Sequence, residues 1–367
     1  MDLLCLTRYD RAGASSRYRT YQYLPHLRDA GFNVEEAPLL GHGYVDNLYR
    51  GSRQSAIRLL RSALERAWKL RRARKYDIVW IEKELFPWVP DVFEQLLRRF
   101  GARMVIDYDD AIFHRYDQHR SALVRRVLGR KIDRVMAAAT LVIAGNAYLA
   151  ERARAAGAAA VEILPTVIDL ERYPVHRQRS SGPLTIGWIG SPSTQRYLLE
   201  ISGALAAFCA ESHARVVAIG PRPDFSVPGV PLEVVPWSED GEVRAIQQFD
   251  IGLMPLPDSP FERGKCGFKL VQYMGCGLPV IASPVGVNRE IVKEGATGFL
   301  AATEEQWLAA LRGLGASEEL RRRMGLAGRT EVEGRFSLKV VAPRLVDLLM
   351  AVARPRAQRA ASAPSQA

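Results

Sequence analysis

A segment rich in glycine and lysine in the C-terminal half of the chain holds side chains suited to binding an anion. Lys265 and Lys269 lie four residues apart, and Gly264 and Gly267 lie beside them. Glycines let backbone N–H groups approach a ligand closely, and the helix that we expect from residue 268 presents unpaired N–H groups and a partial positive charge at its start. The segment therefore predicts a phosphate site. The simpler alternative is an ordinary loop and helix with solvated lysines.

Carboxylates cluster after the strand that we expect at residues 103–106. Asp107, Asp109 and Asp110 occupy three of four successive positions. Neighbouring carboxylates repel one another, which raises their pKa values or favours a bound cation, and clustered carboxylates suit Mg²⁺ or Mn²⁺. The cluster predicts either a catalytic carboxylate or a metal site. His114 follows a few residues later and is a second catalytic candidate, although an isolated histidine is more often structural.

Three further polar segments follow expected strands, at the carboxyl ends where open parallel sheets place ligand sites. They are residues 8–19, which include Gly13, Ser15, Ser16 and Arg17; residues 82–84, Glu-Lys-Glu; and residues 190–194, which are Gly190, Ser191, Pro192, Ser193 and Thr194. Ser193 or Thr194 would cap the helix that follows, and the N–H groups of that helix could hold a phosphate. The alternative for the first and last of these segments is a surface loop or a capped helix without a ligand.

Strands and helices alternate twice along the 367 residues, a length sufficient for two domains. We expect one series of strands at 3–6, 32–37, 78–81, 103–106, 141–144 and 161–164, and a second at 184–189, 215–219, 232–235, 250–254 and 280–282. We expect helices at 21–30, 50–75, 121–139, 197–208, 306–314, 317–328 and 336–352. A segment rich in Pro, Gly and Ser at 174–183 separates the two series, as linkers do. The pattern predicts an α/β protein with two doubly wound domains.

The order of residues from Gln272 to Ala282, followed by Gly286 and Glu290, resembles the donor-binding region of retaining glycosyltransferases with the GT-B fold, of the group 1 (family 4) type. Members carry a glutamate, seven residues, a second glutamate, and then Ala-Met-Ala-x-Gly-x-Pro-Val-Ile-Ala. Here Gln272 takes the position of the second glutamate. Glycine at 264 takes that of the first, and Glu262 is the nearest acidic substitute.

The resemblance implies two domains that face an interdomain cleft: residues 1–175 on the acceptor side and 176–336 on the donor side, with a helix at 337–353 that braces the N-terminal domain. Residues 354–367 have the composition of a disordered tail. The implied reaction moves a sugar, of hexosyl type, from a nucleotide diphosphate donor to a hydroxyl acceptor, with retention at the anomeric carbon. The acceptor that we expect is a lipid-linked or surface glycan.

The resemblance and the local chemistry together assign a site. We expect donor contacts from Gly13, Arg17, Gly190, Ser191, Ser193, Thr194, Glu262, Lys265, Lys269, Gln272, Gly286, Asn288 and Glu290. Asp109 falls where some relatives place an active-site histidine, and His114 is the second choice. GT-B enzymes are generally metal-independent, so we expect neither a metal nor a cofactor.

Two alternatives stay open. One is a nucleotide-sugar epimerase or hydrolase on the same fold, because fold does not fix function. The other is a protein that binds nucleotide-sugars without catalysis, which the glycine at 264 and the glutamine at 272 suggest.

Charge and hydropathy indicate the cellular context. The net charge of +11 favours anionic partners, and residues 50–75 form a basic segment in which Ile57, Leu60, Leu64 and Trp68 recur at helical spacing. This helix either turns its apolar stripe to the core or approaches anionic lipid. We see no aromatic-interleaved basic pattern and expect no nucleic acid. Without a signal peptide, an apolar run of about 18 residues or grouped cysteines, we expect a cytoplasmic protein, peripheral on the inner face of the membrane.

Overall fold

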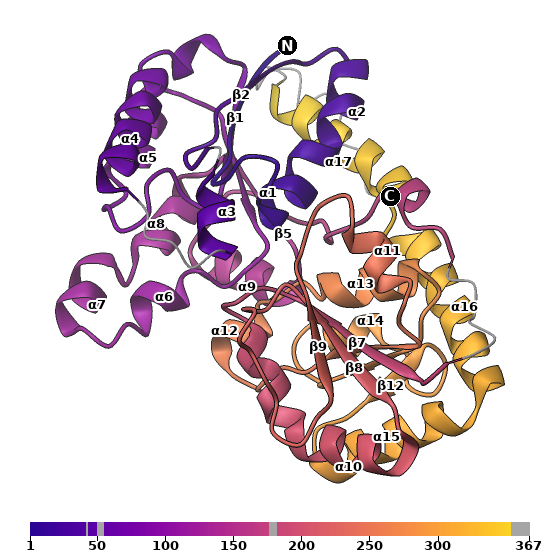
Figure 1. Ribbon diagram of the computed structural model, residues 1–367. Helices are drawn as coiled ribbons and strands as arrows, with labels where there is room; N and C mark the ends of the chain where they lie inside the picture. The colour runs from indigo at the N-terminus through magenta and orange to yellow at the C-terminus, as the bar shows by residue number, and fades with distance from the viewer. Residues whose placement is uncertain (42, 50–54, 176–181, 354–367) are drawn as a thin grey trace. The chain divides into compact units, whose positions relative to one another are not determined.

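The computed structural model describes residues 1–41, 43–49, 55–175 and 182–353, and the chain forms two compact units (Figure 1). The first unit comprises residues 1–45, 53–165 and 341–367, and the second comprises 46–52 and 166–340. The tail predicted at 354–367, most of the linker predicted at 174–183 and the first residues of the helix predicted at 50–75 lie outside the described residues.

The first unit contains a parallel sheet whose six described strands have the order β2-β1-β3-β4-β5-β6. Its strands are β1 (Asp2–Leu6), β2 (Asn33–Glu36), β3 (Ile78–Glu82), β4 (Met104–Tyr108), β5 (Leu141–Ala144) and β6 (Val161–Ile163). Every residue of β3, β4 and β5 is buried, as expected for parallel strands that helices cover on both faces. This confirms the α/β class for the first half of the chain.

Helices cover both faces of this sheet. Figure 1 shows α4 and α5 on one side, and α2 and α17 on the other. The longer elements are α4 (Ala56–Leu70), α5 (Val92–Arg99), α8 (Lys131–Ala138), α9 (Ala147–Ala155) and α17 (Leu338–Ala353); the shorter ones are α1 (Ala14–Arg19), α2 (Leu24–Asp29), α3 (Tyr44–Tyr49), α6 (His114–Asp117) and α7 (Ala122–Leu128). Within this unit, Arg344 of α17 pairs with Glu162 of β6 at 2.9 Å.

Three predicted helices are divided or displaced. The helix expected at 121–139 is two helices, α7 and α8, which separate at Gly129 and Arg130. The helix expected at 21–30 begins as a 3₁₀ turn at Tyr21–Tyr23, and α2 starts only at Leu24 because Pro25 favours the first turn of a helix. The helix expected at 197–208 is a 3₁₀ segment, Gln195–Ile201, followed by α10 (Ser202–Ser212).

The second unit repeats the architecture. Its parallel sheet has the order β12-β11-β10-β7-β8-β9 over the described residues. The strands are β7 (Thr185–Ile189), β8 (Arg215–Ile219), β9 (Leu232–Val235), β10 (Ile251–Met254), β11 (Val280–Ala282) and β12 (Gly298–Leu300). The sequence did not predict β12, which is three residues long and only partly buried. The prediction of two doubly wound α/β domains is confirmed.

The helices of the second unit pack on this sheet, and the buried side chains of α10 and α15 form a core with β7, β8 and β10. The remaining helices are α11 (Glu242–Ile246), α12 (Pro260–Arg263), α13 (Phe268–Gly275), α14 (Asn288–Ile291), α15 (Glu304–Ala316) and α16 (Glu318–Arg335). Among the described residues of both units, none of the helices combines the length and the apolar character needed to span a bilayer.

Helices α13 and α16 approach closely because α16 presents glycines to the end of α13. A Cβ built on Gly325 would lie 1.9 Å from the carbonyl oxygen of Gly277, whereas a Cβ on Gly334, in the same helix, would meet nothing within 4 Å. The backbone of Gly277 follows α13, the helix that carries Lys269. The glycine at 325 therefore fixes the distance between α16 and the segment of the candidate anion site.

We predict that Gly325→Ala destabilises the protein by about 1–3 kcal/mol, because the added methyl group meets backbone that cannot rotate away. The matched variant is Gly334→Ala, which should be neutral or stabilise by up to about 1 kcal/mol, since alanine is the better helix former. Urea unfolding measures both. Equal effects of the two substitutions would contradict the close packing of α16.

Candidate active site

The first unit gathers charged side chains at the carboxyl ends of β1, β3 and β4, which are neighbours in the sheet. Lys83 follows β3, and its Nζ lies 2.7 Å from Oδ1 of Asp109 and 3.6 Å from Oδ2 of Asp110, both of which follow β4. Ser15, in helix α1 after β1, donates its hydroxyl to Oδ2 of Asp109 at 2.6 Å. The loops after β3 and β4 and the start of α1 therefore meet at one ion pair, in which Lys83 is buried and Asp109 is partly buried.

The electrostatics of Asp109 depend on this pair. Burial alone would raise the pKa of Asp109, but the charge of Lys83 and the hydrogen bonds from Lys83 and Ser15 outweigh it and lower the pKa to about 2. In the same way, burial lowers the pKa of Lys83 while Asp109, Asp110 and Glu82 raise it, and the net direction is upward. A general base works best with a pKa near the working pH. Asp109 is therefore better suited to orient a hydroxyl group than to deprotonate it.

The backbone of Lys83 is in the left-handed region, with φ of 66°. Residues other than glycine, asparagine and aspartate rarely adopt this backbone conformation, and residues with strained backbone concentrate at functional sites. The sequence places Lys83 only in a polar segment at the end of a strand. The alternation of Glu-Lys-Glu directly after an apolar strand was the available signal.

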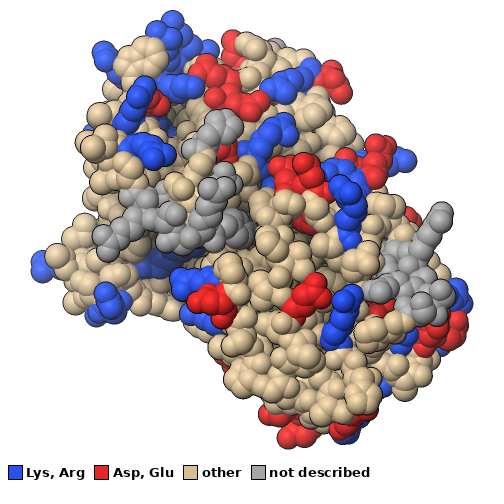
Figure 2. Space-filling model, viewed as in Figure 1, with Lys and Arg blue, Asp and Glu red and all other residues tan. Residues whose placement is uncertain are grey.

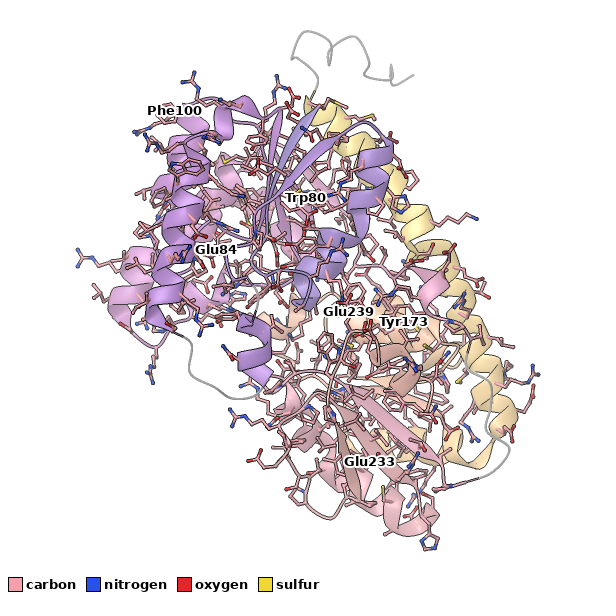
Figure 3. The ribbon with its side chains drawn as sticks, turned by 45° about the horizontal axis from the view of Figure 1, so that its top comes forward. Trp80, Glu84, Phe100, Tyr173, Glu233 and Glu239 are labelled. Carbon is pink, nitrogen blue, oxygen red and sulfur yellow. The ribbon has the colours of Figure 1, made fainter. Side chains whose placement is uncertain are left out.

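The two glutamates that flank Lys83 hold the adjacent loops. Glu82 is buried and accepts hydrogen bonds from Ser16 Oγ at 2.5 Å and from the backbone N–H of Arg8 at 2.8 Å; burial raises its pKa. Glu84 pairs with Lys131 at 2.5 Å and accepts from the Tyr116 hydroxyl at 2.8 Å. Figure 3 shows Glu84 inside the first unit. Both carboxylates are used to fix the loops around the Lys83–Asp109 pair.

The acidic cluster after β4 is balanced by side-chain cations. Asp107 forms a bidentate pair with Arg19, with both N–O distances at 2.8 Å, and Arg19 also donates to the carbonyl of Leu164. Lys83 balances Asp109 and Asp110. Arg19 and Lys83 thus already supply two positive charges to these three carboxylates. In the described part of the chain, no group of three or more His, Cys, Asp or Glu side chains is placed to hold a metal.

The other candidates in the first unit are held by internal contacts. His114 uses both ring nitrogens, Nδ1 with Asp117 at 2.9 Å and Nε2 with the Tyr148 hydroxyl at 2.8 Å, which favours a structural role. Arg17 is buried, with Nη1 donating to the carbonyl of Arg11 at 3.2 Å. Gly13 precedes α1, and a Cβ there would lie 2.4 Å from the Cβ of Tyr9, so only glycine fits.

In the second unit, the predicted anion-binding residues follow β7, β10 and β11, which are also neighbours in their sheet. The ammonium group of Lys269 lies 5.7 Å from the ring centre of Trp188, at the end of β7. That of Lys265 lies 5.2 Å from the ring of Phe261 and 5.9 Å from that of Tyr197. Aromatic faces attract cations, so these contacts hold both lysines near the strand ends.

The loop after β7 is closed by its own hydroxyl groups. The Ser191 N–H donates to Oγ1 of Thr194 at 3.1 Å, and the hydroxyls of Ser191 and Ser193 lie 2.8 Å apart. Thr194 takes the N-cap position of the 3₁₀ segment, but without a side-chain cap bond. The predicted capping by Ser193 or Thr194 is therefore wrong, because these hydroxyls are used to close the loop. Gly190 begins the loop, next to the ring of Trp188.

Four predicted donor contacts have different surroundings. Glu262 is buried and accepts from the Tyr197 hydroxyl at 2.6 Å, while Gln272 is buried and donates to the Tyr173 hydroxyl at 3.0 Å. Asn288 is buried and donates to the carbonyl of Ser283, whereas Glu290 is exposed. The remaining glycine, Gly286, has φ of 51°, and a Cβ there would lie 2.5 Å from the carbonyl oxygen of Arg263. Of the predicted set, the lysines, the loop of residues 190–194 and Gly286 surround adjacent strand ends.

Comparison with known proteins agrees with the resemblance seen in the sequence. Residues 183–317 match the family model described as Glycosyl transferases group 1. Similar solved structures include a sucrose-phosphate synthase (tll1590) from Thermosynechococcus elongatus, with a TM-score of 0.70, 17% identity and coverage of 99% of this chain and 100% of that chain. Among curated protein sequences, no significant match is found.

Two other solved structures match this chain over a similar share of its length. Alr3699/HepE of Anabaena, in complex with UDP-glucose, has a TM-score of 0.68 and 16% identity, and covers 95% of this chain and 99% of that chain. A UDP-forming α,α-trehalose-phosphate synthase from Burkholderia xenovorans has a TM-score of 0.64 and 14% identity, with coverage of 96% and 99%. At these identities the likeness shows the fold, which is GT-B, as the sequence predicted.

We predict that the Lys83–Asp109 pair makes stability sensitive to acid. The folded-state pKa of Asp109, about 2, is below its ordinary value of 3.8, so its contribution is present above pH 4 and is lost as the pH falls toward 2. Between pH 5 and pH 2, the wild type should lose about 1–3 kcal/mol more unfolding free energy than Asp109→Asn. Urea unfolding at stepped pH measures this difference. The exposed control Asp224→Asn should follow the wild type, and an identical acid loss in Asp109→Asn would refute the assignment.

Proposed function

We propose that this protein, whose residues 183–317 match the family model Glycosyl transferases group 1, transfers a hexosyl group from a nucleotide diphosphate donor to a hydroxyl acceptor with retention. The family match and the GT-B fold support sugar transfer. The Anabaena neighbour described with UDP-glucose supports a nucleotide-sugar as the donor, and UDP-glucose is the first compound to test.

The observation that carries this proposal is the placement of two lysines in the matched domain. The ammonium group of Lys269 lies near the ring of Trp188 in β7, and that of Lys265 lies near the rings of Phe261 in α12 and Tyr197 in the 3₁₀ segment after β7. The leaving diphosphate gains negative charge in the transition state. Preorganised cations and backbone N–H groups stabilise that charge without reorganising during the reaction. The geometry therefore suits stabilisation of a departing diphosphate.

Asp109 has a complementary task in the proposed reaction. Its carboxylate is ionised over the whole physiological range, and Lys83 and Ser15 hold it in one orientation. We assign it to orient the acceptor hydroxyl by accepting its hydrogen bond. Retention follows from the family resemblance. Basic charge and the apolar stripe of residues 57–68 support an acceptor that is a lipid-linked or surface glycan, with the enzyme acting from the cytoplasmic face of a membrane.

A second candidate function is nucleotide-sugar binding without transfer. Gln272 favours it, because this residue replaces a family glutamate and donates to Tyr173 inside the unit. An epimerase or hydrolase would release or convert the sugar without an acceptor. The three functions therefore differ in whether the release of nucleoside diphosphate depends on an acceptor.

We predict that nucleoside diphosphate is released from the donor only when a glycan acceptor is present. Asp109→Asn should lower turnover by about 10²-fold or more, because the variant loses the carboxylate that we assign to the acceptor hydroxyl, while donor affinity stays close to that of the wild type. The variant also loses the ion pair with Lys83, so thermal melting must show that it is folded under the assay conditions. A coupled assay for diphosphate release, run over a panel of nucleotide-sugars and acceptors, measures both. Release without an acceptor supports a hydrolase, and donor binding with no release across the panel supports the binding protein.

We also predict that Lys265→Ala and Lys269→Ala each weaken donor binding by about 1.5–3 kcal/mol, the usual value for a hydrogen bond to a charged group. Lys293→Ala is the matched control, because it removes an exposed lysine from the same unit. Isothermal titration calorimetry with the nucleotide-sugar that the wild type binds gives the three affinities. Unchanged affinity in both site variants would reject the phosphate assignment.

A further inference from the structure

Helix α4 is oriented opposite to an ordinary surface helix. The side that faces the first unit is centred on Arg66, which is 2% exposed. Its guanidinium donates to the backbone carbonyls of Thr7, Ala37 and Leu85, which follow β1, β2 and β3, and burial lowers its pKa to about 9. A surface helix normally turns its apolar stripe to the core. Here the buried side chains of the helix are Leu70, at its C-terminal end, and the charged Arg66, whose Nη atoms donate to backbone carbonyls.

The apolar stripe of α4 faces outward instead. Ile57 is 81% exposed, Leu60 62%, Leu64 61% and Trp68 52%. From the sequence, this stripe was compatible with either a core-facing or an interfacial helix. The core-facing alternative is wrong, because Arg66 occupies the opposite, buried side. Exposed apolar side chains at helical spacing mark a surface that contacts a partner.

Helix α5 extends this surface. Val92, Leu96 and Phe100, spaced four residues apart, are also exposed. The guanidinium of Arg74, after α4, lies 5.7 Å from the centre of the Phe100 ring, which connects the two helices at one end. Figure 1 shows α4 and α5 on the same side of the sheet, and Figure 3 places Phe100 at the outer surface. We call this surface the outer face of α4 and α5.

The charge around the outer face is positive. Arg58, Arg61, Arg71 and Arg72 of α4 and its C-terminal end are exposed, and Glu65, the one acidic residue within Ala56–Leu70, pairs with Arg61 at 2.9 Å. Figure 2 shows blue side chains around tan ones over this helix. A partner for this face must have a negatively charged surface and, beneath it, an apolar interior that can receive the exposed side chains. An anionic lipid bilayer has both properties.

We propose that the outer face of α4 and α5 docks on anionic bilayers, with the stripe from Ile57 to Trp68 among the acyl chains and the flanking arginines at lipid phosphates. This proposal rests on the proposed function only for its biological purpose, which is to bring the enzyme to a membrane-borne acceptor. Vesicle binding requires no sugar transfer, so either proposal can fail while the other stands.

The first experiment is flotation of the full chain with phosphatidylcholine vesicles, with and without phosphatidylglycerol, at low and high salt. We expect binding to the anionic vesicles at low salt and weaker binding at high salt, because salt screens the arginines. No binding at low salt, or equal binding to both kinds of vesicle, overturns the proposal.

Matched variants locate the surface. Leu64→Asp should reduce the partition coefficient by about tenfold or more, because a leucine leaves the acyl region and a negative charge enters. Leu199→Asp makes the same change at an exposed leucine of the second unit and should bind as the wild type does.

Arg71→Ala should reduce binding by about fivefold, and Arg323→Ala, which removes an exposed arginine of α16, should have no effect. Equal losses in a variant and its control overturn the assignment. Thermal melting checks that all four variants fold.

A labelling experiment separates insertion from simple adsorption. All four native cysteines, Cys5, Cys209, Cys266 and Cys276, are buried, so an engineered exposed cysteine can be labelled selectively. The emission of an environment-sensitive fluorophore on Ile57→Cys should shift to shorter wavelength with anionic vesicles, whereas the emission of one on Leu326→Cys should not.

Light scattering tests the competing occupant of the outer face, which is a second copy of the chain. A dimer that Leu64→Asp dissociates, in a protein that does not bind vesicles, overturns the proposal.

Discussion

The buried pair of Lys83 and Asp109 is the interaction on which the carboxyl edge of the first sheet depends. It joins the loops after β3 and β4, and Ser15 connects helix α1 to them. Removing one member of a buried ion pair leaves an uncompensated charge, which typically costs about 3–5 kcal/mol. The same pair supports the left-handed backbone of Lys83, since its side chain reaches Asp109 from that conformation. The positions of these loops, the backbone conformation of Lys83 and the charge of Asp109 therefore all depend on the same ion pair.

Much of the fold follows from simple patterns in the sequence. Apolar runs bounded by glycine, proline and acidic residues located eleven of the twelve described strands, because parallel strands are buried on both faces and carry a strong signal. The pattern failed where burial is partial, as in Gly298–Leu300. It also failed to orient α4. Helical spacing shows that Ile57, Leu64 and Trp68 share a face, but the direction of that face depends on the carbonyls that receive Arg66, which come from three distant segments.

The candidate site was predictable to a different degree in each unit. Local spacing alone predicts an anion site at the glycines and lysines around residue 265, and the structure places Lys269 of this segment near the ring of Trp188 in β7. The tyrosine partners of His114, Glu262 and Gln272 were not predictable. Their partners are the hydroxyls of Tyr148, Tyr197 and Tyr173, which lie 34, 65 and 99 residues away in the sequence. No local spacing encodes such pairs, because they arise only when the strands have assembled.

The buried guanidinium of Arg66 also has a mechanical meaning. It holds three carbonyls that belong to three separate segments, and each segment continues from the end of a different strand. A planar group with fixed donors cannot follow one of these carbonyls without straining its bonds to the others. Arg66 thus connects helix α4, which carries the exposed stripe, to the segments that follow three strands. A displacement of the exposed stripe would therefore act, through Arg66, on the segments that follow β1, β2 and β3. The segment that follows β3 begins with Lys83.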